Sequence, residues 1–252
     1  MSKVRPVLVC ALIGLVGVAG ALSETIQVRD APGGETPFGT PNGYFLEGTA
    51  SGGDPIGTPV NGEDEILYDG AFSLEIQHEG SDEWESLITY CIEPVQGIQF
   101  GTNPDDLVGL PHETAALTDL DGITAQEAVW IEVLYANAFD DTLTGPDTYT
   151  TSVKASAFQT IIWELKQDDT FQLTGFDSNN NYRLDTSWQF TQDVVDLANQ
   201  WFDNIQSGQW TDRQPLVALT SPISQDLILP VPEPASGLML VLGLGIACWR
   251  RR

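Results

Sequence analysis

Cys91 is the residue of this chain best suited to covalent chemistry. The 252 residues contain three cysteines, and the other two, Cys10 and Cys248, lie in apolar stretches near the two ends. If processing removes both ends, Cys91 is left with no cysteine partner in its own chain. Its thiol would then pair with another chain, stay buried as a small apolar group, or act as a nucleophile.

Residues 1–23 predict a secretory signal peptide. They open with Lys3 and Arg5, continue with an apolar run from Val7 to Leu22, and end in small residues typical of a cleavage site. The alternative is an uncleaved membrane anchor. We therefore expect the body of the protein to be exported.

Residues 231–252 carry a second targeting signal. They read Pro232-Glu233-Pro234, an apolar stretch from Gly237 to Trp249, and Arg250-Arg251-Arg252. A basic cluster after an apolar segment stops translocation, and this segment is short for a permanent span. The order closely resembles the PEP-CTERM sorting signal of Gram-negative bacteria that make exopolysaccharide. The resemblance implies an exosortase as sorting partner, transient inner-membrane anchoring, cleavage near Pro-Glu-Pro, and release to the surface or matrix; a simple membrane anchor is the alternative.

The body between these ends is strongly acidic. The chain has 36 Asp and Glu against 10 Lys and Arg, a net charge of −26, and all the acids except Glu233 lie in residues 24–231. Such a body repels phosphate backbones, which argues against nucleic-acid binding. A hydrophobic content of 42% with 7 Trp and 10 Phe argues against disorder.

Cys91 is expected on the second strand of a hairpin. Residues 72–76 alternate apolar and polar side chains, which predicts a half-buried strand, and 87–92 form a second, β-branched run after an acidic turn. Strand periodicity places Ile88, Tyr90 and Ile92 on the more apolar face. Cys91 then shares the other face with Thr89 and Glu93, where it could meet another element.

Helical periods follow the strands. Residues 125–138 predict a helix with Thr124 as N-cap, residues 152–165 an amphipathic helix, and residues 191–206 a third. In the second helix, Gln159 lies at the border of the apolar face. Strands early and helices later predict an α+β fold, with an N-terminal antiparallel β part carrying the Cys and a helical part carrying the Gln.

Tyr90-Cys91 on a strand and Gln159-Thr160-Ile161-Ile162-Trp163 on a helix resemble the thioester domains of bacterial surface adhesins. In that family a Tyr-Cys step is joined to a Gln in a helix that reads roughly Gln-x-Ala-Ile-Trp. The resemblance spans about residues 40–215, although Ile161 stands where Ala is usual and Phe158 where a small polar residue often precedes the Gln. It implies an internal Cys91–Gln159 thioester, shielded from water by Tyr90 and Trp163.

Such a bond explains why these two residue types are needed. A thiolate attacks the Gln carboxamide, ammonia leaves, and an activated acyl group remains. An amine-bearing partner, either a protein Lys or a polyamine, would take the acyl group and free the thiol. Because each molecule attaches once, the protein is expected to be an adhesive rather than a turnover enzyme, and no cofactor is expected.

Other interpretations remain open at this point. Gln159 could be a solvated helix-edge residue beside an inert Cys91, in a non-covalent structural protein of the exopolysaccharide matrix. Cys91 could instead form an intermolecular disulfide, or pair with the nearby Gln96 or Gln99, although Pro94 favours a turn there. A hydrolase acting on matrix polysaccharide has no positive support in the sequence.

A weak calcium-loop pattern lies at residues 177–185. It offers oxygens from Asp177, Asn179, Asn181 and Asp185, but Tyr182 replaces the usual Gly and Trp188 the usual Glu, so a polar turn is the simpler interpretation. His78 and His112 have no metal-site spacing and are expected in strands or on the surface. No catalytic motif and no resident metal is predicted.

The expected domain organisation has five parts. They are a signal peptide at 1–23, a flexible acidic segment rich in Gly and Pro at 24–39, a thioester-like domain at 40–215, a linker at 216–230, and the sorting signal at 231–252.

Overall fold

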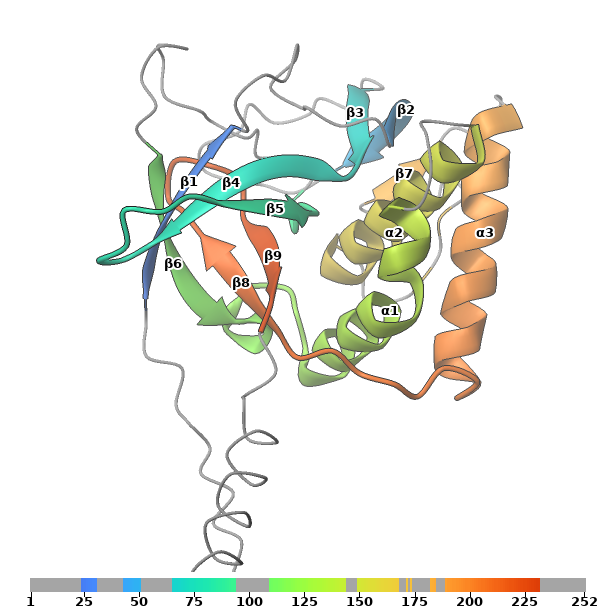
Figure 1. Cartoon of the computed structure of the whole chain (residues 1–252). Coiled ribbons are helices and arrows are strands. Elements are labelled where there is room, and N and C mark those ends of the chain that lie inside the picture. Colours follow the sequence, from blue (N-terminus) through green and yellow to red (C-terminus); the bar gives the residue numbers. More distant parts are fainter. Residues whose placement is uncertain are drawn as a thin grey trace, which may run out of the picture.

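In the computed structural model, strands and helices form two adjoining parts (Figure 1). The structure describes residues 24–30, 43–50, 65–93, 109–143, 149–167, 171, 173, 182–184 and 189–231. All statements below concern these residues. The signal peptide, most of the sorting signal and the calcium-type positions Asp177, Asn179, Asn181 and Asp185 lie outside them.

The larger sheet is antiparallel and nearly closes into a barrel. Its order is β5-β4-β1-β6-β8-β9, and its strands are β1 (Thr25–Asp30), β4 (Phe72–His78), β5 (Glu85–Thr89), β6 (Leu110–Ala116), β8 (Leu216–Thr220) and β9 (Leu227–Pro230). An antiparallel bridge between Cys91 and Leu227 joins the chain just after β5 to β9. The two outermost strands of the sheet therefore meet at Cys91.

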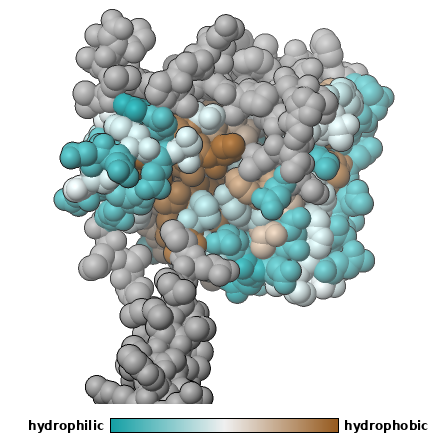
Figure 2. Space-filling view, in the orientation of Figure 1, coloured by the Kyte–Doolittle hydropathy of each residue, from teal (hydrophilic) through white to brown (hydrophobic). Residues whose placement is uncertain are grey.

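The predicted hairpin is present as β4 and β5, which pair antiparallel from Phe72↔Thr89 to Ile76↔Glu85. In β4 the alternation is as expected, with Phe72, Leu74 and Ile76 buried. In β5 the expected faces are reversed, because Leu87 and Thr89 are buried and Ile88 is 38% exposed. The surface shows a brown hydrophobic area between the barrel and the helices (Figure 2).

Three helices pack beside the barrel, with α2 (Tyr149–Gln167) in contact with both α1 (Ala125–Leu143) and α3 (Gln189–Gln206). A short 3₁₀ turn, Leu117–Asp119, links β6 to this part. A second sheet of order β3-β2-β7 also contacts α2 (Figure 1), and its strands are β2 (Gly43–Ala50), β3 (Glu65–Gly70) and β7 (Tyr182–Leu184). The α2 helix is thus enclosed by other elements.

Neighbouring residues in the sequence explain where α1 begins and which face of α3 is buried. The Thr124 hydroxyl accepts from the Glu127 N–H at 3.3 Å and the Glu127 carboxylate accepts from the Thr124 N–H at 2.6 Å, a capping box at the predicted N-cap. Helix α3 is amphipathic, with one buried stripe. In contrast, α2 is buried on all sides from Thr151 to Leu165 except at Lys154, so the single apolar face predicted for it is wrong.

Two expected domain boundaries are corrected. The segment predicted to be flexible, 24–39, contains β1, a central strand whose Ile26 and Val28 are buried between β4 and β6. The predicted linker, 216–230, forms β8 and β9. Strands β8 and β9 are short, and each has a partner far away in the sequence: β8 pairs with β6, and β9 bridges to Cys91. Strands therefore precede and follow the helices.

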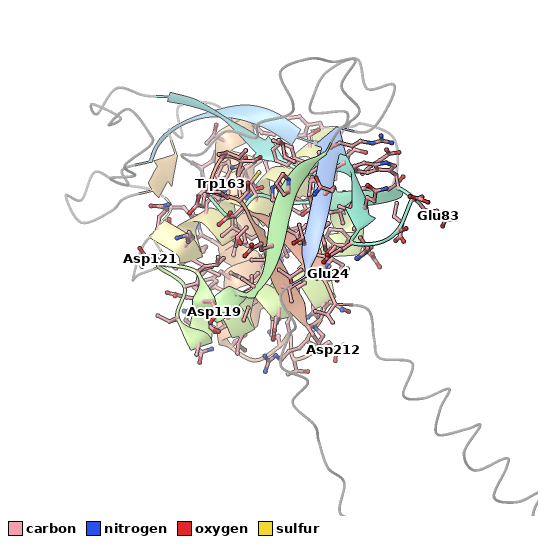
Figure 3. The ribbon with its side chains drawn as sticks, turned by 90° about the vertical axis from the view of Figure 1, so that its left-hand side faces the viewer. Glu24, Glu83, Asp119, Asp121, Trp163 and Asp212 are labelled. Carbon is pink, nitrogen blue, oxygen red and sulfur yellow. The ribbon has the colours of Figure 1, made fainter. Side chains whose placement is uncertain are left out.

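Acidic side chains gather at the periphery. Glu83, Asp119, Asp121 and Asp212 are exposed around the rim, whereas Trp163 lies in the packed interior (Figure 3). This distribution keeps most of the negative charge in water, where like charges repel least.

Candidate functional site

Cys91 lies where the barrel closes. Regular strand β5 ends at Thr89, and the next three residues, Tyr90 to Ile92, are fully buried. Three hydrogen bonds hold residues 89–92 against residues 226–228 at the start of β9: the Ile92 N–H donates to the Asp226 carbonyl at 2.9 Å, the Ile228 N–H to the Tyr90 carbonyl at 3.1 Å, and the Thr89 hydroxyl to the Ile228 carbonyl at 2.5 Å. The backbone N–H and C=O of Cys91 itself bond elsewhere.

Those two backbone groups bind the side chain of Gln159. The Cys91 N–H donates to Gln159 Oε1 at 3.0 Å, and Gln159 Nε2 donates to the Cys91 carbonyl at 2.7 Å. Because one contact needs an acceptor and the other a donor, the orientation of the amide is determined. The structure therefore brings together the two residues that the sequence singled out, 68 positions apart in the chain.

The site is closed to solvent. Cys91 and Gln159 are each 0% exposed, so a solvated Gln159 at the edge of its helix is excluded as a description of this residue. Cys91 is not in a disulfide, and its burial leaves no room for a disulfide with another chain in this conformation. Gln96 and Gln99 lie outside the described residues.

An aromatic cluster borders the pair. It consists of Tyr90, Tyr135, Phe139 and Phe158, and the two residues that directly precede Cys91 and Gln159 have ring centroids 4.4 Å apart. Tyr135 stacks on Phe139 at 4.1 Å, and Phe139 meets Tyr90 and Phe158 at 6.2 and 6.0 Å. Burial raises the pKa of the Tyr135 hydroxyl, and the charge of Asp140 adds to this.

The two residues expected to shield the site are both buried: Tyr90 is in the aromatic cluster, and Trp163 is one helical turn after Gln159. Sequence reasoning missed Tyr135 and Phe139, which α1 contributes. Their spacing of four residues, which puts both on one side of α1, was the available signal.

Charged groups flank the next residues of the chain. The Lys166 ammonium at the end of α2 lies 3.9 Å from the Glu93 carboxylate and donates to the Asp121 carbonyl. The Gln225 amide donates to the Glu93 carbonyl. These contacts connect the end of α2 to the Cys91 segment a second time, two turns beyond Gln159.

Half-buried Asp226 and buried His112 are two titratable groups near the contact between the Cys91 segment and β9. Burial raises the pKa of Asp226, opposed by the Ser221 N–H and by the charges of His112 and Lys166. Burial likewise lowers the pKa of His112, opposed by hydrogen bonds to the Leu110 and Gln225 backbone and by the charge of Asp226. Both histidines lie in strands, as expected: His112 is in β6 and only 2% exposed, and His78 ends β4 and pairs with Glu24 at 3.0 Å.

The raised pKa of Asp226 gives a pH-dependent prediction. A carboxyl with a raised folded-state pKa stabilises the fold below its unfolded pKa, and this stability is lost as pH rises through the folded value. Asp226→Asn keeps an acceptor for the Ser221 N–H, 3.0 Å away. We expect it to raise the melting temperature at pH 7.5 but not at pH 3.5, as measured by circular dichroism.

The matched control is Asp193→Asn on α3. Hydrogen bonds from Tyr149 and Gln189 lower the pKa of Asp193. Its contribution is therefore present above the unfolded pKa and lost as pH falls through the folded value, so this variant should melt lower at pH 7.5. The same sign for both variants would contradict the assignment of Asp226.

No metal centre is visible in the part of the chain that the structure describes: no three His, Cys, Asp or Glu residues there gather closely enough to hold an ion. The calcium-type loop stays a prediction, because only its residues Tyr182–Leu184 are described, as β7.

Comparison with known proteins identifies the end of the chain. Residues 230–252 match the PEP-CTERM protein-sorting motif. The PEP-CTERM motif marks this protein for sorting by an exosortase, with export and transient membrane anchoring on the way to the cell surface. Searches of curated proteins and of solved structures returned no match. Among the described residues, no helix is long and apolar enough to cross a membrane.

Proposed function

We propose that this exosortase-sorted surface protein attaches covalently to amine-bearing partners through an internal thioester between Cys91 and Gln159. The observation that carries the proposal is the double hydrogen bond between the Gln159 carboxamide and the Cys91 backbone, at 3.0 and 2.7 Å, in a fully buried setting. These contacts hold the electrophile of one residue against the residue that bears the nucleophile.

The bond would form by acyl transfer from nitrogen to sulfur. The thiolate of Cys91 adds to Cδ of Gln159, and the negative charge moves to Oε1. The Cys91 N–H, 3.0 Å from that oxygen, stabilises the charge as an oxyanion-hole donor does. Collapse of the adduct breaks the Cδ–Nε2 bond, and the thiol proton leaves with the nitrogen as ammonia.

The surroundings favour this reaction over hydrolysis. A primary carboxamide is a poor electrophile, so the two groups must be held in near-attack contact for the step to proceed. The hydrogen-bonded amide restrains Gln159 on α2, and the hydrogen bonds between residues 90–92 and residues 226–228 restrain the Cys91 segment on the barrel. The buried rings of Tyr90, Tyr135 and Phe158 in this cluster keep water away from an acyl group that water would otherwise cleave.

An incoming amine completes the function. Its nitrogen attacks Cδ, the thioester carbon–sulfur bond breaks, and Cys91 is released as a thiol while the partner becomes an amide of Gln159. Each molecule reacts once. The acidic body, with a net chain charge of −26, attracts cationic amines such as exposed lysines and polyamines from the matrix.

A passive role for the pair is the competing function. The Gln159 amide also satisfies the Cys91 N–H and C=O where the regular strand has ended, which a purely structural glutamine would do as well. Thioester formation forfeits the 2.7 Å bond from Nε2, whereas the structural role keeps it. In that case the protein is a non-covalent component of the exopolysaccharide matrix.

Intact mass distinguishes the two functions. Full-length protein, freshly purified under mild conditions, should be lighter than the unmodified chain by about 17 Da, the mass of the lost ammonia, and methylamine should add about 31 Da while releasing the Cys91 thiol. Cys91→Ala and Gln159→Glu should show neither change. An unmodified mass together with a Cys91 thiol that titrates from the start would refute the covalent function and leave the passive one.

A further inference from the structure

Strand β9 contacts the reactive segment directly. Its first residue, Leu227, bridges to Cys91, and its Ile228 exchanges hydrogen bonds with Tyr90 and with the Thr89 hydroxyl. On its other side β9 pairs with β8 from Leu219↔Leu227 to Leu216↔Pro230. The Cys91 segment is therefore held between Gln159 of α2 and the last strand of the barrel.

The same strand leads straight into the sorting motif. Pro230 is both the last residue of β9 and the first residue of the motif. The Val231 N–H donates to the Pro215 carbonyl at 2.9 Å, and the Gln214 amide donates to the Val231 carbonyl at 3.1 Å. No spacer separates the barrel from the motif, and only two residues stand between Pro230 and Leu227.

The contact that closes the barrel, between residues 89–92 and residues 226–228, is called the β9 seam here. It is the weakest strand contact of the barrel. Among the described residues it contains one bridge pair and three hydrogen bonds, whereas the β4–β5 and β1–β4 ladders each pair five residues. Local opening occurs where few hydrogen bonds and little buried surface must be given up. We expect the β9 seam to open before any other ladder of this sheet, starting from its C-terminal end.

We propose that β9 is a latch over the Cys91–Gln159 pair, and that loosening its sorting-motif end gives reagents access to Cys91. The chemistry that follows access rests on the proposed thioester, but the latch itself concerns access only. While β9 is in place, it protects the Cys91–Gln159 pair from reagents. Because the sorting motif begins at the end of β9, binding or cleavage of the motif during sorting would act on this strand.

The first test removes one seam hydrogen bond without altering Cys91 or Gln159. In the full chain, Thr89→Val deletes the hydroxyl that donates to Ile228, and Thr89→Ser keeps it. Thr220→Val is the matched control, since its hydroxyl donates to the Glu113 carbonyl across β6 and β8, away from the seam. Methylamine consumption measures access if the thioester forms, and thiol-reagent labelling quantified on the peptide that contains Cys91 measures it if the thioester does not form.

Access through local opening scales with the opening equilibrium, so one lost buried hydrogen bond should raise the rate about threefold to tenfold in Thr89→Val. Thr89→Ser and Thr220→Val should stay near the wild-type rate. Equal rates in Thr89→Val and Thr220→Val would overturn the latch, whichever reagent reports it. A wild-type chain with unmodified mass refutes the thioester alone.

The second test loosens β9 at its far end. Gln214→Ala removes the amide that holds Val231, and it touches neither Cys91 nor Gln159. The control is Gln192→Ala, which removes an exposed amide bound to Asp196 on α3. Gln214→Ala should raise the access rate about twofold to threefold and Gln192→Ala should not. Identical rates in these two variants would refute the connection between the motif end and the site.

Discussion

Replacing Gln159 by Ala should lower the free energy of unfolding by roughly 3 to 5 kcal/mol, because it leaves two buried backbone groups unpaired and opens a cavity. The groups are the N–H and C=O of Cys91, whose contacts with Gln159 are 3.0 and 2.7 Å. The loss should be measured by urea unfolding in a Cys91→Ala background, in which no thioester can form. The value then reports the hydrogen bonds and packing alone.

Gln192→Ala in the same background is the control. This side chain is half-buried on α3 and its amide makes an exposed hydrogen bond to Asp196, so its loss should change stability by no more than about 0.5 kcal/mol. A loss below about 1 kcal/mol in Gln159→Ala would mean that water or a neighbouring group replaces the amide at the Cys91 backbone. The site would then be far less restrained than its geometry indicates.

Phe158→Ala should cost about 3 to 5 kcal/mol, the range for a fully buried aromatic residue. Its ring contacts Tyr90, Tyr135 and Phe139, with centroids between 4.4 and 6.0 Å away. The variant should also slow ammonia loss in any chain that still folds, because the ring restrains the residue directly before Gln159. Thermal unfolding and intact mass measure the two effects.

Phe190→Ala provides the comparison for that variant. Phe190 is only partly buried on α3, and its ring meets the exposed Tyr149 edge to face at 5.5 Å. We expect a loss of roughly 1 kcal/mol and no effect on the mass of the product. Equal losses in the two variants would show that the aromatic cluster contributes no more than an ordinary surface contact.

Local signals in the sequence predicted the elements that carry the site. The alternation from Phe72 to Ile76 and the Thr124 cap are decided by neighbours within a few residues, and both are present in the structure. Strands β8 and β9 gave no such signal. Their runs, Leu-Val-Ala-Leu-Thr and Leu-Ile-Leu-Pro, are short and apolar without alternation, and their partners lie up to 139 residues away at Thr89.

The sequence predicted the two central residues of the candidate site, but it did not predict the contacts between them. The resemblance to thioester domains picked out Cys91 and Gln159, but sequence could not show that the amide would bind the Cys91 backbone. The face assignment at Ile88 was wrong because β5 ends at Thr89, after which Tyr90 to Ile92 are buried together. The contribution of Phe139 depends on how α1 packs on α2, which no local pattern reports.

The position of β9 also bears on how the molecule folds. The barrel closes between the segment after β5 and β9, the last strand of the sheet in chain order, so the contacts that seal it join residues up to 139 positions apart. Such long-range pairing makes folding slow, because loop entropy must be lost before contacts form. A chain still emerging during export would therefore lack the seam at Cys91. The Cys91–Gln159 pair would be closed to water only once residues 227–230 have arrived.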